Sequence, residues 1–286
     1  MGVKSSASRR GAILVSVLWI MIFLGFLAVI LRGQMTGVVA GVRLTEDKAS
    51  ARILAEAGLA LVAAEIRAGP PDGVEKVGDR ISSEITLPAG VASVSATNEA
   101  LRIDLNTAER PLIVGALRAA GAASVAVEEL ATRIINRRSQ PSDGQPQPGS
   151  NKRVFQTVSE LAAFPGITLN VAIALERYLT VSSGLIGVRL EALDERLLSA
   201  IPNLPSSARS AIAQYDAGRI SREQLEGVLA GVSFNTSGQA QTWRFELTTT
   251  LQSGYSENFE GLILVSATDE KPYRLLDWHR STTEFE

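Results

Sequence analysis

The chain has 286 residues, which predicts about two domains at ~150 residues each. Hydrophobic residues make up 45% and charged residues 20%, so an extended disordered protein is excluded. The net charge of −2 gives no bulk attraction to nucleic acid or to an anionic surface. The sequence contains no cysteine and one histidine, His279. A disulfide framework, a thiolate metal site and a cysteine nucleophile are therefore excluded, and histidine catalysis is disfavoured.

The first feature along the chain is an uncharged apolar run over 12–31, AILVSVLWIMIFLGFLAVIL. A helix of that length spans ~30 Å, the thickness of a bilayer's hydrocarbon core. Residues 1–43 carry five basic and no acidic side chains, whereas 44–286 carry 23 basic and 30 acidic ones, a net of −7. This asymmetry predicts a single transmembrane helix over 12–31 with a cytoplasmic N-terminus and the body outside. A plain signal anchor is the simplest alternative.

Helical apolar spacing continues beyond the apolar run as far as residue 67, and Gly69-Pro70-Pro71 ends it. One helix over 12–67 would be ~84 Å long. The alternative is two helices with a hinge among Gly33, Gly37 and Gly41.

Strand patterns of period two occupy two separate segments, 72–105 and 231–286. The separators Pro88-Ala89-Gly90 and Asn98-Glu99 predict hairpin turns in the first segment. Three apolar strands, around Trp243, around Leu262 and over 273–278, are expected in the second. Together they predict one antiparallel sheet packed on the extramembrane half of the long helix.

The segment between them, 106–230, is expected to be helical. Asn106 or Thr107 is a candidate N-cap, and helices are predicted over 112–120 and 125–138. Capping boxes at Thr157–Glu160 and Ser221–Gln224 mark further helical starts. The predicted fold class is α+β, with an inserted all-α subdomain of helix-hairpin-helix or SAM-like type.

Several motifs carry a family resemblance. Arg9-Arg10-Gly11 followed directly by Ala12 resembles the leader of type IV pilins and type II pseudopilins. IDLNTA at 103–108, FQTVSELAAFPGIT at 155–168, LTVSSG at 179–184 and YRLLDW at 273–278 resemble successive landmarks of the K-type minor pseudopilin, the general secretion pathway protein K family. The resemblance implies a pseudopilin fold that extends over nearly the whole chain.

The same resemblance implies the processing sites. Residues 1–11 would be a leader that prepilin peptidase removes after Gly11, and the new N-terminus, Ala12, would be methylated. Ser16 stands at the fifth mature position, where most pilins carry glutamate. Among pilins and pseudopilins, the K-type minor pseudopilin is the exception that lacks this glutamate.

The function implied by the resemblance is structural. The chain would be a minor pseudopilin at the tip of the type II secretion pseudopilus, where it helps to initiate or cap the fibre that exports folded proteins across the outer membrane. Its partners would be the I-type and J-type minor pseudopilins, the major pseudopilin and prepilin peptidase. It would lie in the bacterial inner membrane with a periplasmic body, and no enzymatic activity is expected.

A membrane-anchored DNA-binding protein is the alternative function, because IDLNTA and Pro165-Gly166-Ile167 also resemble helix-hairpin-helix modules. Thr168 stands where the DNA-binding form usually has a second glycine, and residues 101–180 have a net charge of only +2. We therefore expect no nucleic-acid partner. Calcium is possible in the family, but the loop over 139–148 offers only Asp143, so no metal or other cofactor is expected.

Overall fold

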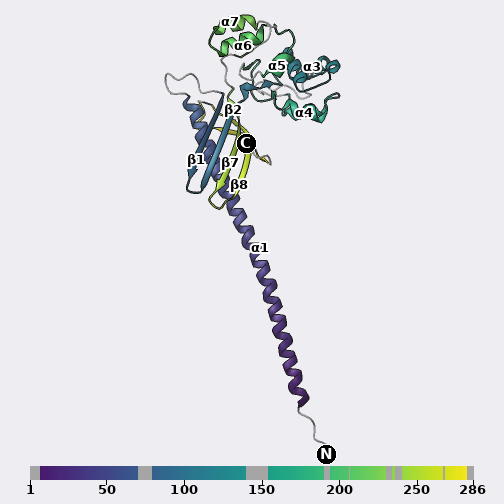
Figure 1. The fold of residues 1–286 in the computed structure, drawn as a ribbon, viewed down its shortest axis with the longest axis vertical. Helices are drawn as coiled ribbons and strands as arrows, with labels where there is room; N and C mark the ends of the chain where they lie inside the picture. The colour runs from purple at the N-terminus through teal and green to yellow at the C-terminus, as the bar shows by residue number, and fades with distance from the viewer. Residues whose placement is uncertain are drawn as a thin grey trace, which may run out of the picture.

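The computed structural model describes residues 7–69, 79–139, 154–189, 194–205, 207–229, 234–235, 240–266 and 268–281. Within the first helix, side chains are described for residues 15–28 and from residue 41 onward. The molecule consists of a long helical stalk that leads into a head made of a sheet and a cluster of helices (Figure 1).

Helix α1 (Ala7–Ala68) is a single unbroken helix of 62 residues. It continues through Gly33, Gly37 and Gly41, so the one-helix prediction is confirmed and the hinge alternative is wrong. Gly69 ends it with a φ of +67°, a left-handed conformation that glycine adopts without steric cost.

Among the residues that the structure describes in full, no helical segment is both long enough and apolar enough to cross a membrane. The predicted transmembrane segment lies partly outside that set, because the side chains of residues 12–14 and 29–31 are not described.

The sheet has five antiparallel strands in the order β1-β2-β7-β8-β9. They are β1 (Arg80–Leu87), β2 (Gly90–Asn98), β7 (Thr242–Leu251), β8 (Ser256–Leu264) and β9 (Arg274–Ser281). Strand β2 pairs with β7 from Gly90↔Leu251 to Asn98↔Trp243. Segments far apart in sequence therefore form neighbouring strands, which confirms the predicted single sheet. The predicted turn at residues 88–89 is also confirmed.

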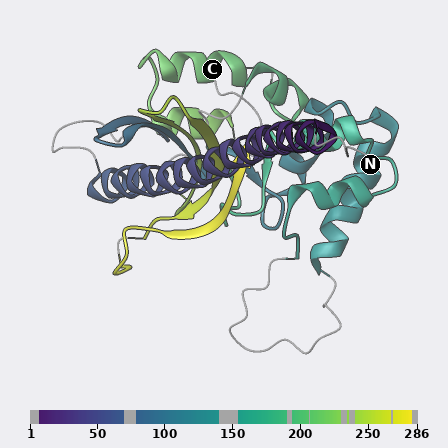
Figure 2. The same ribbon diagram turned by 90° about the horizontal axis from the view of Figure 1, so that it is seen from below.

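One face of the sheet packs on the upper part of α1, as Figures 1 and 2 show. Ala55, Leu59, Val62 and Ala63 of α1 are fully buried in this core. The sheet contributes apolar side chains that are at most 7% exposed: Val94, Ala96, Trp243, Phe245, Leu247, Phe259, Ile263 and Val265. Gly58 permits the close approach, because a Cβ there would lie 3.1 Å from Val94 Cγ2 and 3.2 Å from Ala92 Cβ. The predicted packing of the sheet on the C-terminal half of the long helix is confirmed.

The helical insert follows β2 and lies beyond the end of the sheet remote from the N-terminus (Figure 1). Its helices are α2 (Arg110–Ala119), α3 (Ser124–Ser139), α4 (Leu169–Leu175), α5 (Glu195–Ala200), α6 (Ala208–Asp216) and α7 (Arg222–Val228), with the 3-10 helices η1 (Glu99–Leu101) and η2 (Val158–Ala163). Two short parallel pairs complete it: β3 (Ile103–Asp104) with β4 (Leu179–Thr180), and β5 (Val188–Arg189) with β6 (Phe234–Asn235). Because β4 and β5 lie within residues 106–230, the prediction of an all-α insert is wrong, and the insert is mainly helical.

The insert has two apolar cores. The larger one joins α2, α3, α4 and one side of α5, and the smaller one joins α6 and α7 with the other side of α5. Leu197 and Ile201 belong to the first core and Leu198 to the second, so α5 connects them. The capping boxes predicted at Thr157–Glu160 and Ser221–Gln224 are both present.

Two other sequence predictions in this region are wrong. Asn98-Glu99 does not form a hairpin turn. The buried side-chain amide of Asn98 instead makes two hydrogen bonds with the backbone of Ala240, at 2.9 and 3.0 Å, and the chain leaves the sheet at this point. Ile103 and Leu105 are consequently buried in the insert. The N-cap of α2 is Glu109 and not Asn106 or Thr107. Those two side chains instead bind backbone groups elsewhere in the insert.

Candidate assembly interface

The predicted residues Gly11, Ala12 and Ser16 lie in the N-terminal part of α1, and Figure 1 shows that this end of the helix is remote from the head. Gly11 and Ala12 are within α1, but their side chains are outside the described set, as are residues 1–6 of the predicted leader. The Ser16 side chain is exposed on the same helix.

The lower part of α1 exposes a continuous apolar surface. Every described side chain over 15–28 is exposed. The large apolar ones are 41–68% exposed and comprise Val15, Val17, Leu18, Trp19, Ile20, Met21, Ile22, Phe23, Leu24, Phe26 and Leu27. Apolar surface left in water forgoes ~25 cal/mol per Å² of burial energy. A patch of this extent is typical of a surface that another molecule or a membrane covers.

The upper part of α1 has two unlike faces. The face turned to the sheet is fully buried, whereas a second apolar stripe runs along the opposite face at helical spacing. The stripe consists of Val42, Ala49, Ile53, Ala57, Ala60 and Ala64, of which Val42 is 52% and Ile53 68% exposed. We call it the outer stripe. Because alanine is small, a second helix could approach this face closely.

Edge strand β9 also exposes apolar side chains. Leu275 and Leu276 are 47% and 46% exposed. Trp278 packs on the rings of Phe245 and Phe259, with centroids 5.3 and 5.1 Å away.

The side of α1 that faces β9 carries an ion pair. Arg52 pairs with Glu56 at 3.1 Å and holds its guanidinium 6.0 Å from the Trp278 ring centroid. Burial, and to a lesser degree the Glu56 carboxylate, raises the pKa of Tyr273. The outer stripe is thus bounded by a polar border next to β9.

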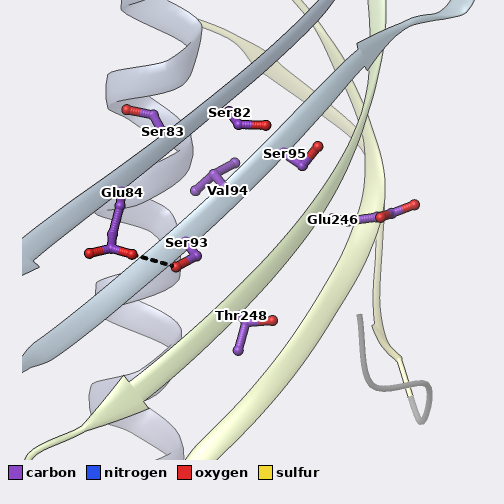
Figure 3. A pocket seen from close by; sticks show the side chains of 8 residues that line it. All are labelled: Ser82, Ser83, Glu84, Ser93, Val94, Ser95, Glu246 and Thr248. Atoms are coloured by element: carbon purple, nitrogen blue, oxygen red, sulfur yellow. Dashed lines mark hydrogen bonds between the residues drawn. The ribbon is translucent and has the colours of Figure 1, made fainter. Parts of the chain in front are cut away.

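The opposite face of the sheet is polar. Figure 3 shows a shallow groove of about 510 Å³ over β1, β2 and β7, lined by Ser82, Glu84, Ser93, Ser95, Glu246 and Thr248 and bordered by Ser83 and Val94, whose side chains contact α1. The Glu84 carboxylate accepts a hydrogen bond from Ser93 at 3.4 Å. None of these lining residues is a histidine or lysine that could act as a base for a serine nucleophile. The groove therefore has the character of a solvated sheet face.

The titratable side chains do not form a metal site in the described part of the chain, where no group of three or more His, Cys, Asp or Glu residues could hold an ion. Asp143, the one carboxylate of the predicted loop, lies outside the described residues. His279 lies on edge strand β9, 3.0 Å from Glu260 and 3.3 Å from Asp277. His279 therefore interacts with two carboxylates on the surface of the sheet.

The motif shared with DNA-binding hairpins is used inside the fold. Asp104 accepts hydrogen bonds from the backbone amides of Asn106 and Gly184 at 2.8 and 2.6 Å. The Asn106 amide exchanges two hydrogen bonds with the backbone of Phe155. At the hairpin, the Ile167 amide donates to the Phe164 carbonyl at 3.1 Å. These groups hold the insert together, so they do not point to a phosphate-binding role.

The architecture defines a class: a long N-terminal helix on an antiparallel sheet, with a helical insert between the second and third strands along that sheet. A chain with the same fold occurs in the crystal structure of the GspK-GspI-GspJ complex from the type 2 secretion system of enterotoxigenic Escherichia coli. The TM-score is 0.57 at 11% sequence identity, and the match covers 85% of this chain and 99% of that one. This likeness confirms the predicted mixed helix and antiparallel-sheet fold.

Comparison with protein-family models gives no match. No curated protein matches the sequence.

Proposed function

We propose that this chain is a K-type minor pseudopilin of a type II secretion system, a non-enzymatic structural subunit at the tip of the pseudopilus. The observation that carries the proposal is the fold, which matches a chain of the GspK-GspI-GspJ complex over 85% of the present chain. The exposed apolar surface of α1 supports it, because a fibre subunit needs a helix whose partners come from other molecules.

Assembly would use α1 in two stages. Residues 12–31 would first lie in the inner membrane, with the N-terminus in the cytoplasm and the head in the periplasm. Prepilin peptidase would then cut after Gly11 and methylate Ala12. The freed helix would pack against other pseudopilin helices through its lower apolar surface and the outer stripe, with the I-type, J-type and major pseudopilins as partners.

A tip position suits two features of the chain. Ser16 is uncharged, so it needs no oppositely charged partner in an apolar helix bundle, where an unpaired charge is costly. The insert projects beyond the end of the sheet remote from the stalk (Figure 1), where its bulk would hinder another subunit from stacking. We propose no bound cofactor, calcium or nucleic acid as part of this role.

The leading test is mass spectrometry of the full chain made with and without prepilin peptidase. We expect loss of residues 1–11 and a methylated Ala12 only when the peptidase is present. Gly11→Ala should block the cut, while Gly25→Ala, which has nothing within 4 Å of the added methyl, should leave it unchanged. An intact leader in the presence of active peptidase would contradict the assignment.

A second test addresses the outer stripe. Because the chain has no cysteine, Ile53→Cys introduces a unique thiol on the stripe, and Ser82→Cys places the matched control on the polar sheet face. Ile53→Cys should form a disulfide with cysteines placed along the helix of a co-expressed I-type or J-type pseudopilin. Equal crosslinking by Ser82→Cys would rule out a specific role for the stripe.

Retention of duplex DNA by the same chain in a salt-sensitive gel shift would instead favour the DNA-binding alternative.

A further inference from the structure

A group of buried charged side chains lies where the helical insert joins the sheet. Glu99, in η1 directly after β2, has a fully buried side chain. Its Oε1 accepts from Arg102 Nη1 at 2.5 Å and from Arg244 Nε of β7 at 3.0 Å. Its Oε2 accepts a hydrogen bond from the Thr180 hydroxyl of β4. The Glu99 carboxylate, at the end of β2, therefore contacts both the central strand β7 and strand β4 of the insert.

A second buried pair connects the same two bodies. Asp79, just before β1, and Arg189 of β5 form an ion pair at 2.9 Å with side chains 4% and 11% exposed. The backbone carbonyl of Asp79 also accepts a hydrogen bond from the backbone N–H of Asn98 at 2.7 Å, which fixes Asp79 to the end of β2. The insert is therefore attached to the sheet at two separate points, by the hydrogen bond from Thr180 to the Glu99 carboxylate and by the Arg189–Asp79 ion pair.

The sequence landmarks 103–108 and 179–184 meet at this junction. Strand β3 pairs with β4 through Ile103↔Leu179 and Asp104↔Thr180. Asp104 also accepts from the Ser183 hydroxyl at 3.2 Å and from the Gly184 amide at 2.6 Å. The motifs that carry the family resemblance thus position Thr180 against Glu99.

Buried ionic contacts resist displacement, because a buried carboxylate that moves away from its donors remains desolvated and unpaired. Linked hydrogen bonds in a low dielectric also support one another. Burial lowers the pKa of Arg102, and the Glu99 carboxylate opposes that shift, as expected for a desolvated pair. Domains within one chain usually move relative to each other unless a large apolar interface joins them, so contacts that resist such motion matter for the shape of the head.

We propose that Glu99, Arg102, Arg244, Thr180, Asp79 and Arg189 form an orientation clamp, which holds the insert and the sheet as one rigid body. In a fibre, an axial force on α1 would then be transmitted to the insert, because the head would not bend where the insert joins the sheet. That use rests on the proposed function, whereas the clamp itself is a property of the isolated chain.

The clamp can be tested by pulsed EPR (double electron–electron resonance), which measures the distance distribution between two spin labels on the full chain in detergent. The absence of native cysteines makes the labels unique. Ser82→Cys with Glu176→Cys spans the junction from β1 to the end of α4, and Ser82→Cys with Glu46→Cys reports on the sheet and α1 alone. Glu99→Gln should widen the distance distribution across the junction and leave the internal pair unchanged. Glu129→Gln, which breaks an exposed ion pair with Arg133 inside the insert, is the matched control and should change neither.

A milder variant guards against misfolding. Thr180→Val removes the hydroxyl that donates to Glu99 and accepts from the Ser182 backbone amide, and it keeps the side-chain shape and both charges of the Glu99 ion pairs, so it should widen the junction distribution less than Glu99→Gln does. If Glu99→Gln also widens the internal pair, Thr180→Val decides the question. A folded variant whose junction distribution is as narrow as that of the unmodified chain overturns the clamp. Because this readout needs neither the leader nor other pseudopilins, its failure is distinguishable from failure of the peptidase test.

Discussion

The two halves of α1 belong to one continuous helix but find their partners in different places. Between residues 51 and 66, the helix is amphipathic, and its buried face meets Phe245, Leu247 and Phe259 of its own sheet. Between residues 15 and 28, apolar side chains surround the helix and all are exposed. One face of the upper half is thus covered by the chain's own sheet, whereas the apolar side chains of the lower half have no cover among the described residues.

The largest expected effect concerns the face of the upper half that meets the sheet. Leu59 is fully buried, so Leu59→Ala should lower the free energy of unfolding by about 2–5 kcal/mol. Ile53→Ala, on the outer stripe and 68% exposed, should change it by no more than about 0.5 kcal/mol. Urea denaturation of the head, followed by tryptophan fluorescence, measures both. Similar losses for the two variants would remove the distinction between the faces.

The next effect concerns the lower half. On the proposed membrane assignment, Ile22→Asp near the middle of the apolar run should make insertion less favourable by about 3 kcal/mol. Ile22→Leu is the matched control. The measurement is the fraction of chain that resists carbonate extraction from membranes, and the stability of the head should remain unchanged. Full retention of the aspartate variant would argue against a lipid environment for this segment.

A smaller effect is expected from filling the space between α1 and the sheet. A Cβ at Gly58 would lie 3.1 Å from Val94 Cγ2, so Gly58→Val should overpack the contact and cost about 1–3 kcal/mol. Gly41→Val adds the same side chain where nothing lies within 4 Å, and no overpacking is expected. Thermal unfolding of the two variants compares a packed with an open position of one helix. A Gly58→Val variant as stable as Gly41→Val would mean that the approach is less close than the structure indicates.

The smallest effect tests the border between α1 and β9. Arg52 is largely exposed, so loss of its contacts with Glu56 and Trp278 in Arg52→Ala should cost no more than about 1 kcal/mol. Arg52→Lys should restore part of the loss, because the charge remains while the planar stacking group is removed. Chemical denaturation in low and high salt separates the ionic part. A loss well above this range would show that Arg52 contributes to the core.

Sequence patterns predicted those elements whose signals are local. The uninterrupted helix through Gly41, the turn before Gly90 and the capping boxes at Thr157 and Ser221 each depend on neighbouring residues, and all are present. The hairpin expected at Asn98 failed for the opposite reason. Its amide binds Ala240, a residue 142 positions away, which no local pattern reveals.

The candidate site divides in the same way. Gly11, Ala12 and Ser16 could be selected from the motif alone, and their roles remain predictions. The helical spacing of Val42, Ile53 and the alanines between residues 49 and 64 was visible in the sequence. Which side of the helix stays free was not, because that depends on the face that the sheet covers.

The sequence alone determined the stalk, the acidic head, the split of the strands around a helical segment and the absence of cysteine. Those features follow from composition, hydrophobic period and caps, which act between near neighbours. Only the tertiary structure decided that β2 pairs with β7 across the insert and that Glu99 meets Arg244 and Thr180. Such contacts join distant parts of the chain, and their energies depend on burial and geometry that exist only once the chain has folded.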